Sequence, residues 1–208
     1  MVKRKKSYIK KINQLDTLSV HAGVKTDPLT GAVMTPIYAT STYAHDRPGE
    51  HKGYEYSRSQ NPTREVLENS IAELESGYKA FAFASGVAAQ TAVLDLLKPG
   101  DHVIAFDDLY GGTFRLFNEI KSKSSNIEFT FVDLNTNFSK EIKKNTKMIW
   151  IETPTNPLLK ITDLKRIARI ARKNKLITVC DNTFATPYNQ RPLEHGIDIV
   201  NHSTTKYI

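Results

Sequence analysis

The sequence contains a single cysteine among 208 residues, so no internal disulfide can form. Cys180 lies in an apolar stretch, which favours a small buried side chain over a reactive thiol. The absence of disulfides fits a reducing cytoplasm, where we expect the protein to be located. No apolar run approaches the roughly 18 residues of a membrane-spanning helix. We therefore predict no transmembrane segment.

Two nucleotide-binding motifs are also missing. The chain has no Gly-x-Gly-x-x-Gly and no phosphate-loop lysine motif, which counts against binding of dinucleotides or nucleoside triphosphates. We predict no metal site either. The composition, with 39% hydrophobic and 25% charged residues, is that of a globular chain.

The positive charge of the chain is concentrated at its N-terminus. The formal net charge is +7, and six basic residues without an intervening acid account for nearly all of it: Lys3, Arg4, Lys5, Lys6, Lys10 and Lys11. A short solvated tail explains this pattern better than a nucleic-acid-binding groove does. The tail has no apolar core, so it does not indicate a targeting sequence.

Two regions differ in their patterning. Residues 1–60 show little periodicity and are rich in turn formers such as Asp27-Pro28 and Pro48-Gly49. Such a long irregular stretch is uncommon inside a compact domain, so we predict an arm that reaches across a partner subunit. A helix is predicted over residues 63–75, and residues 61–208 are predicted to form one domain.

Strand-like and helix-like segments alternate after this helix. The predicted strands are Ala80–Ala84, His102–Phe106, Glu128–Val132, Met148–Glu152, Leu176–Cys180 and Asp198–Asn201. The predicted helices are Gly86–Leu97, Gly112–Lys121, Ser139–Lys143 and Asp163–Asn174. This alternation predicts an α/β domain with a mostly parallel sheet and helices on both faces.

An acid and a lysine near the end of the chain suggest a cofactor site. Asp181 follows the apolar run 176–180, and burying a carboxylate is costly without a cationic partner. Lys206 follows three hydroxyl residues, Ser203, Thr204 and Thr205. In a pyridoxal phosphate (PLP) site, a lysine forms a Schiff base and an acid partners the pyridinium nitrogen. The alternatives are a helix-capping Asp and a solvated surface lysine.

Three further candidates follow predicted strands, where ligands bind in open α/β sheets. Ser85-Gly86-Val87 could present backbone N–H groups to an anion, although glycine is common at such turns for packing alone. Tyr110 could stack on a flat heterocycle or be an ordinary turn residue. Asn156, between two prolines, could bind a ring oxygen or make a local turn bond.

Taken together, these residues resemble the transsulfuration family of PLP enzymes, which includes cystathionine γ-synthase, cystathionine γ-lyase, cystathionine β-lyase and methionine γ-lyase. The resemblance runs from about residue 18 to residue 208. Its blocks are Tyr54–Arg58, Asn61–Arg64, Ser85–Ala89, Asp108–Thr113, Glu152–Pro157, Asp181–Pro187 and Ser203–Lys206. It implies the large domain of an aspartate-aminotransferase-like (fold type I) protein.

The resemblance also implies roles for individual residues. Lys206 would hold PLP, Asp181 would pair with the ring nitrogen, Tyr110 would stack on the ring and Asn156 would lie by its phenolate oxygen. The phosphate would be bound by the backbone N–H groups of Gly86 and Val87 and by the hydroxyls of Ser203 and Thr205. Many relatives have Met at the position of Val87. The remaining residues of the implied cofactor site are Ser85, Thr183 and, from a neighbouring subunit, Tyr56 and Arg58.

The resemblance implies a homotetramer acting on sulfur-containing amino acids, either cystathionine or a homoserine ester plus cysteine. Methionine γ-lyases carry a cysteine at the position of Gly112, so the Tyr110–Thr113 block is more similar to cystathionine γ-lyase or γ-synthase. We favour γ-elimination of cystathionine, with γ-synthase, β-lyase and an inactive fragment as alternatives. Family members are nearly twice as long, so we expect the C-terminal small domain and its substrate-binding arginine to be absent.

Overall fold

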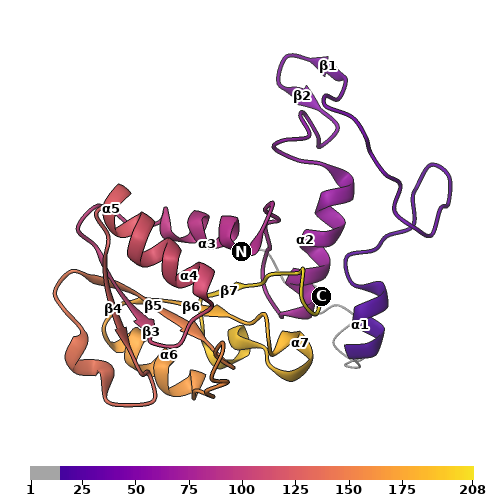
Figure 1. Ribbon diagram of the computed structural model, residues 1–208. Coiled ribbons are helices and arrows are strands. Elements are labelled where there is room, and N and C mark those ends of the chain that lie inside the picture. The colour runs from indigo at the N-terminus through magenta and orange to yellow at the C-terminus, as the bar shows by residue number, and fades with distance from the viewer. Residues whose placement is uncertain (1–14) are drawn as a thin grey trace. The chain divides into compact units, whose positions relative to one another are not determined.

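The computed structural model describes residues 15–208, drawn in colour in Figure 1. The chain forms two compact units, one ending at Ala82 and the other spanning Phe83–Ile208. The basic tail predicted from residues 3–11 lies outside the described residues.

Within its described residues 15–82, the first unit contains little regular structure apart from two helices. Its elements are α1 (Leu15–His21), the short antiparallel strands β1 (His45–Arg47) and β2 (Glu50–His51), and α2 (Pro62–Leu74). Helix α2 begins where Asn61 accepts hydrogen bonds from the N–H groups of Thr63 (2.9 Å) and Arg64 (3.3 Å). The helix predicted over residues 63–75 is confirmed. Because α1 and α2 contact each other, α2 is part of this unit.

The second unit is built on a five-stranded parallel sheet, which confirms the predicted α/β class. In spatial order its strands are β4 (Glu128–Val132), β3 (His102–Phe106), β5 (Thr146–Glu152), β6 (Ile177–Asp181) and β7 (Ile199–Asn201). The helical elements are α3 (Gly86–Leu94), α4 (Gly111–Arg115), η2 (Leu116–Lys121), α5 (Ser122–Ser124), η3 (Phe138–Glu141), α6 (Leu164–Lys173), α7 (Thr186–Asn189) and η4 (Pro192–His195). Helices α3 and α4 lie over one face of the sheet and α6 lies over the other (Figure 1).

The core of this unit explains why the sheet forms. Every side chain of β3 is buried, and so are most of those of β5 and β6, as expected for strands covered on both faces. Trp150 and Phe117 are fully buried and meet edge to face, with their ring centroids 5.1 Å apart. Burying one such side chain stabilises the fold by about 1.5–3 kcal/mol. Cys180 is buried in β6, as predicted.

The strand predicted at Ala80–Ala84 is wrong, since these residues form no regular structure. The alternation of aromatic residues and alanine is typical of a strand, but Phe81 and Phe83 are exposed. The order of the sheet ends at β7, and residues 80–84 do not pair with that edge strand. The N–H of Ala82 donates instead to the side chain of Glu68 (2.9 Å). A strand needs a neighbour to pair with, and the sequence pattern does not reveal that neighbour.

Several predicted helix bounds also need correction. The helix expected over residues 112–121 starts at Gly111 and changes into a π-helix from Leu116 onward. The helix expected to reach Leu97 ends at Leu94, and the one expected over residues 139–143 is a 3₁₀ turn over Phe138–Glu141. Helix α7, which no sequence signal predicted, follows Asp181 by a few residues.

Candidate active site

Three polar side chains end three neighbouring strands. Glu152, Asp181 and Asn201 are the last residues of β5, β6 and β7, and they are register partners across the sheet. Paired residues on adjacent strands project to the same face, so these side chains form one row. They are 5%, 5% and 4% exposed, respectively. The row lies at the carboxyl edge of the sheet, where ligands bind in α/β proteins.

The Asp181 carboxylate is held by hydrogen bonds from uncharged groups. Its Oδ2 accepts from Nε2 of Gln90 (3.2 Å) and Nδ2 of Asn201 (3.1 Å), and its Oδ1 accepts from the N–H of Thr183 (3.0 Å). Within residues 15–208, no salt bridge includes Asp181. A buried carboxylate with amide donors but no cation is suited to receiving a cationic group from a ligand.

Glu152 is the second acid of the row. Its Oε2 accepts the backbone N–H of Tyr110 at 3.0 Å, which fixes the start of α4. Burial, and then the nearby Asp181 charge, raise the pKa of Glu152 to about 8, against smaller opposing effects of the N–H groups of Tyr110 and Asn156. Glu152 is therefore largely protonated at neutral pH.

The N-terminus of α3 approaches the loop after β7. Ser85 caps this helix by accepting the N–H of Ala88 at 3.1 Å. Gly86 lies so close to Ser203 that a Cβ atom at Gly86 would come within 3.0 Å of the Ser203 Cβ. The N–H of Ser203 donates to Oγ1 of Thr183 (2.9 Å), which links this loop to the segment after Asp181. Free N–H groups at such a helix start favour an anion.

Two further candidates are accessible to a ligand. Lys206 is exposed in a turn closed by the hydrogen bond from its N–H to the Ser203 carbonyl oxygen (3.2 Å), and Thr205 is exposed in the same turn. Tyr110 is 44% exposed, and its ring lies against Gly112, where a Cβ atom would overlap the ring. An exposed aromatic face next to the buried row is suited to stacking on a flat ligand.

The loop with Asn156 is ordered by a buried acid. Asp108 accepts from the hydroxyl of Thr155 and from the N–H of Leu158 (3.0 Å). The Thr155 N–H donates in turn to the Lys160 carbonyl oxygen (3.1 Å). Asn156 is half-buried between these anchored residues. Within residues 15–208 no hydrogen bond joins the Asn156 side chain to the row, and its contact with a ring oxygen stays a prediction.

Tyr56 and Arg58 lie in the first unit. The Arg58 guanidinium is 4.9 Å from the centroid of the Tyr56 ring, and Tyr56 pairs with Thr42 in an isolated β-bridge. Their predicted role is in the site of a neighbouring subunit. That role, like the role of each site residue above, stays a prediction.

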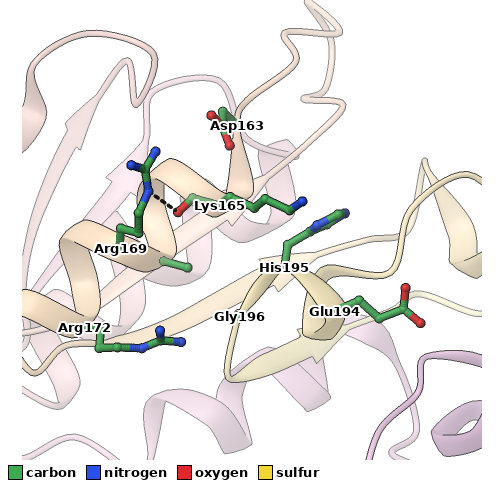
Figure 2. Close-up of a pocket in the computed structure, with 8 residues that line it drawn as sticks. Asp163, Lys165, Arg169, Arg172, Glu194, His195 and Gly196 are labelled. Carbon is green, nitrogen blue, oxygen red and sulfur yellow. Dashed lines mark hydrogen bonds between the residues drawn. The ribbon is translucent and has the colours of Figure 1, made fainter.

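A hollow elsewhere on the second unit contains none of the predicted site residues. It lies between α6 and η4 and is lined by Asp163, Lys165, Ala168, Arg169, Arg172, Glu194, His195 and Gly196 (Figure 2). Most of its charged side chains extend from the exposed side of α6, and Arg169 Nε donates to the Lys165 carbonyl oxygen at 3.4 Å. The hollow is therefore separate from the row formed by Glu152, Asp181 and Asn201.

Two other features are absent from residues 15–208. No helix there is long and apolar enough to cross a membrane. No group of three or more histidine, cysteine and acidic side chains in the same residues is placed to hold a metal ion.

Fold and site together define a class of protein, a parallel α/β domain that presents an anion-binding helix start and a buried carboxylate at one sheet edge. The sequence pattern of the family described as "Cys/Met metabolism PLP-dependent enzyme" matches residues 16–208. The chain belongs to this family, whose cofactor is pyridoxal phosphate.

The names of similar proteins state three different enzyme activities. The chain is 56% identical to a cystathionine beta-lyase of Coxiella burnetii, 51% to a probable cystathionine gamma-synthase of Herpetosiphon aurantiacus and 54% to a cystathionine gamma-lyase of Bacillus subtilis. These matches cover 95%, 92% and 92% of this chain and 52%, 60% and 51% of the relatives. The chain thus spans little more than half the length of these curated relatives, which are transsulfuration enzymes of differing reaction.

Solved structures agree with this assignment. The crystal structure of metB from Corynebacterium glutamicum superposes with a TM-score of 0.91 at 45% identity, covering 95% of this chain and 52% of that one. That of cystathionine gamma-lyase from Lactobacillus plantarum, complexed with L-serine, gives 0.90 at 46% identity, covering 93% and 51%.

The described residues fit PLP. A protonated pyridine nitrogen would supply the cation that Asp181 lacks, and the close approach of Gly86 to Ser203 leaves a side-chain-free helix start for the phosphate. When bound, PLP supplies an electron sink for a carbanion at the α-carbon of an amino acid.

The sequence indicated no role for Gln90, Glu152 and Asn201, which contact predicted site residues, or for Thr113, which contacts Gln90. A weak signal existed for two of them. Glu152 ends an apolar strand in the same way as Asp181, and Gln90 interrupts the run of small and apolar residues in α3.

Proposed function

We propose that the chain carries the cofactor-binding site of a transsulfuration lyase that cleaves L-cystathionine by γ-elimination. The observation that supports a PLP site most directly is Asp181, a buried carboxylate that accepts three hydrogen bonds from uncharged groups and has no cationic partner among residues 15–208. A carboxylate in this position keeps a ring nitrogen protonated, which is what PLP-dependent elimination requires.

In this proposal each site residue has a defined task. The Lys206 amine would hold the cofactor through its aldehyde and would carry the proton of the substrate α-carbon. The Tyr110 ring would stack on the cofactor and exclude water from that side. The N–H groups of Gly86 and Val87, with the hydroxyls of Ser203 and Thr205, would bind the phosphate and so hold the cofactor near Asp181.

The γ-elimination consumes one water and yields cysteine, 2-oxobutanoate and ammonia. Gly112, which leaves no side chain beside the Tyr110 ring, agrees with a cystathionine γ-lyase or γ-synthase, whereas methionine γ-lyases have a cysteine at this position. The second candidate is β-elimination, which yields homocysteine, pyruvate and ammonia. It is supported by the 56% identity with the Coxiella burnetii cystathionine beta-lyase.

Cofactor binding can be tested on the 208-residue chain. We expect PLP to give the chain a yellow absorbance band, and borohydride reduction to attach the cofactor to the peptide that contains Lys206. Lys206→Ala should abolish both, while Lys173→Ala, a change at an exposed lysine of α6, should leave them unchanged. Attachment to another lysine would overturn the assignment of Lys206.

The reaction is identified from its keto-acid product. The chain with PLP and cystathionine should yield 2-oxobutanoate, and pyruvate instead would establish the β-lyase. Consumption of an O-acylhomoserine together with cysteine would establish the γ-synthase. The assay is run on the chain alone and on the chain fused to the remainder of the Bacillus subtilis relative, because the arginine that grips the substrate carboxylate is expected in that remainder. PLP binding without any product from either protein would support the inactive alternative.

The assembly and the location are further parts of the proposal. A homotetramer built from dimers would bring Tyr56 and Arg58 of one subunit to the phosphate of another. Sedimentation velocity on the chain with PLP tests this assembly. A cytoplasmic location agrees with the single buried cysteine.

A further inference from the structure

Helix α3 contains one fully enclosed polar side chain, Gln90, which is 2% exposed. Its Nε2 donates to Oδ2 of Asp181 at 3.2 Å, and its Oε1 accepts from Oγ1 of Thr113 at 3.1 Å. Asp181 and Thr113 are also buried. We propose that Gln90 is a positioning residue that aligns Asp181 for the ring nitrogen of the cofactor and couples this carboxylate to helix α4.

The amide of Gln90 has a defined orientation. If it were rotated by half a turn, its Oε1 would face Oδ2 of Asp181, and two acceptors would be in contact. The Thr113 hydroxyl supplies the donor that the observed orientation needs on the other side. Two hydrogen bonds therefore connect Thr113 to Gln90 and Gln90 to Asp181, each with a donor facing an acceptor. Such a connected network makes the arrangement rigid.

The contacts also decide which carboxylate oxygen remains available. Among the hydrogen bonds of residues 15–208, Oδ2 accepts two amide donors, from Gln90 and Asn201, while Oδ1 accepts only the N–H of Thr183. A carboxylate oxygen has about two accepting positions, so a free position is left on Oδ1. Gln90 and Asn201 thus direct the open side of Asp181 toward a ligand.

Helix α4 connects this network to the stacking residue. Thr113 lies in the first turn of α4, and Tyr110 is the residue that precedes the helix. Tyr110 is anchored separately through its N–H on Glu152. Gln90 therefore ties the ring-nitrogen partner to the helix that carries the stacking ring, and loss of its amide should loosen both contacts to the cofactor.

The inference rests on the proposed PLP site and is tested with Gln90→Leu, which keeps the approximate volume and removes both hydrogen bonds. Gln190→Leu is the matched control, because it too removes two hydrogen bonds of a glutamine amide: Gln190 Nε2 donates to the Thr153 carbonyl oxygen and to Oδ1 of Asn182, and not to Asp181. We expect Gln90→Leu to weaken PLP binding by about fivefold to thirtyfold relative to Gln190→Leu. Binding is measured by equilibrium titration of the 208-residue chain.

A spectroscopic measurement separates positioning from a general loss of stability. With ¹⁵N-labelled PLP, the ring nitrogen should be protonated in the unaltered chain and in Gln190→Leu, and shifted toward the unprotonated form in Gln90→Leu. Donors to a carboxylate favour its ionised form and so favour a proton on the nitrogen. Thr113→Val should produce a smaller shift of the same sign, and Thr113→Ser, which keeps the hydroxyl, should restore the signal.

The outcomes distinguish this inference from the proposed function. If the unaltered chain fails to bind PLP, the proposed function is wrong and the inference is wrong with it. If the chain binds PLP and the ring-nitrogen signal of Gln90→Leu equals that of Gln190→Leu, only the role of Gln90 is overturned.

Discussion

Asp181 combines a charge, burial and three hydrogen bonds, and no ion pair among residues 15–208 neutralises it. Its neighbour Glu152, at the same register of the adjacent strand, stays protonated near neutral pH, because burial and the Asp181 charge raise its pKa to about 8. At the scale of single residues, the site therefore offers the Asp181 carboxylate, next to a neutral acid, to one cationic ligand group.

The charge of Asp181 can be tested by Asp181→Asn. We expect the fold to persist, because the amide retains an acceptor for neighbouring donors, and the PLP-dependent rate to fall at least about tenfold, or about 1.4 kcal/mol of barrier. The effect is measured as turnover at saturating PLP, using the chain fused to the remainder of the Bacillus subtilis relative. Circular dichroism controls for folding. Near-normal turnover with full cofactor occupancy would contradict the assignment.

The raised pKa of Glu152 predicts a pH-dependent stability for the cofactor-free chain. Between about 4.5 and about 8 the folded state holds a proton that the unfolded state has released, so stability must fall as the pH rises through this window. Glu152→Gln keeps an acceptor for the Tyr110 N–H without the charge. It should reduce this slope and stabilise the protein above about pH 8.

Urea unfolding at several pH values between 5 and 9 measures both proteins, within the range over which the fold persists. Glu55→Gln, a change at an exposed glutamate of the first unit, provides the control. An unchanged slope in Glu152→Gln would show that Glu152 is already ionised in the cofactor-free fold.

At the scale of elements, a buried histidine joins three strands. His102 begins β3, and its ring nitrogens lie 2.8 Å from Oγ1 of Thr146 on β5 and 2.8 Å from Oγ1 of Thr130 on β4. Its side chain is fully buried. The contacts link neighbouring strands at the amino end of the sheet, opposite to the edge that carries the acids.

Protonation of His102 should weaken the sheet. Burial, and then the Lys143 charge, lower the pKa of His102, while Glu128 and Glu141 oppose the shift. The unfolded chain therefore takes up a proton near about pH 6.5 that the folded chain resists. The stabilising effect is complete above that pH and is lost as the pH falls toward the folded pKa.

His102→Gln is expected to remove this acid-side slope while lowering stability at neutral pH by about 1–3 kcal/mol, since a buried hydrogen-bonded side chain is replaced. Thermal or urea unfolding between pH 5 and 7.5 provides the measurement. His45→Gln, in the exposed strand β1, is the control. An acid-side slope that survives in His102→Gln would assign the effect to other groups.

At the scale of the whole molecule, the two units have different predicted tasks. The second unit contains the buried row and Lys206, whereas Tyr56 and Arg58 belong to the first unit. The arm prediction holds that residues 1–60 of one subunit, which belong to its first unit, complete the site of another. It therefore requires an assembly with at least two chains.

Mixing two variants with impaired cofactor binding tests that requirement. Arg58→Ala should weaken the phosphate contact across subunits, and Lys206→Ala should remove the cofactor linkage within a subunit. Equal mixing, with exchange of subunits, produces hybrid dimers in which one of the two sites has both residues, or about one quarter of all sites. Borohydride-fixed PLP at limiting cofactor concentration counts these sites. Signal no higher than the average of the separate variants would place Arg58 in the site of its own subunit, or outside it.

The sequence by itself determined the α/β class and the five strands β3–β7, because long apolar runs separated by amphipathic helices permit few other folds. It also supported family membership, since several ordered motifs agree. It did not distinguish the false strand 80–84 from a true one, because pairing depends on a neighbour that the local pattern does not contain.

Tertiary structure decided the parts that depend on distance through space. Gln90 and Asp181 are 91 positions apart, and only the packing of α3 on the sheet brings them together. The row formed by Glu152, Asp181 and Asn201 depends on strand register, and the raised pKa of Glu152 depends on that row and on its burial. These properties arise from desolvation and from charges meeting across strands, which are set by the fold rather than by any short segment of sequence.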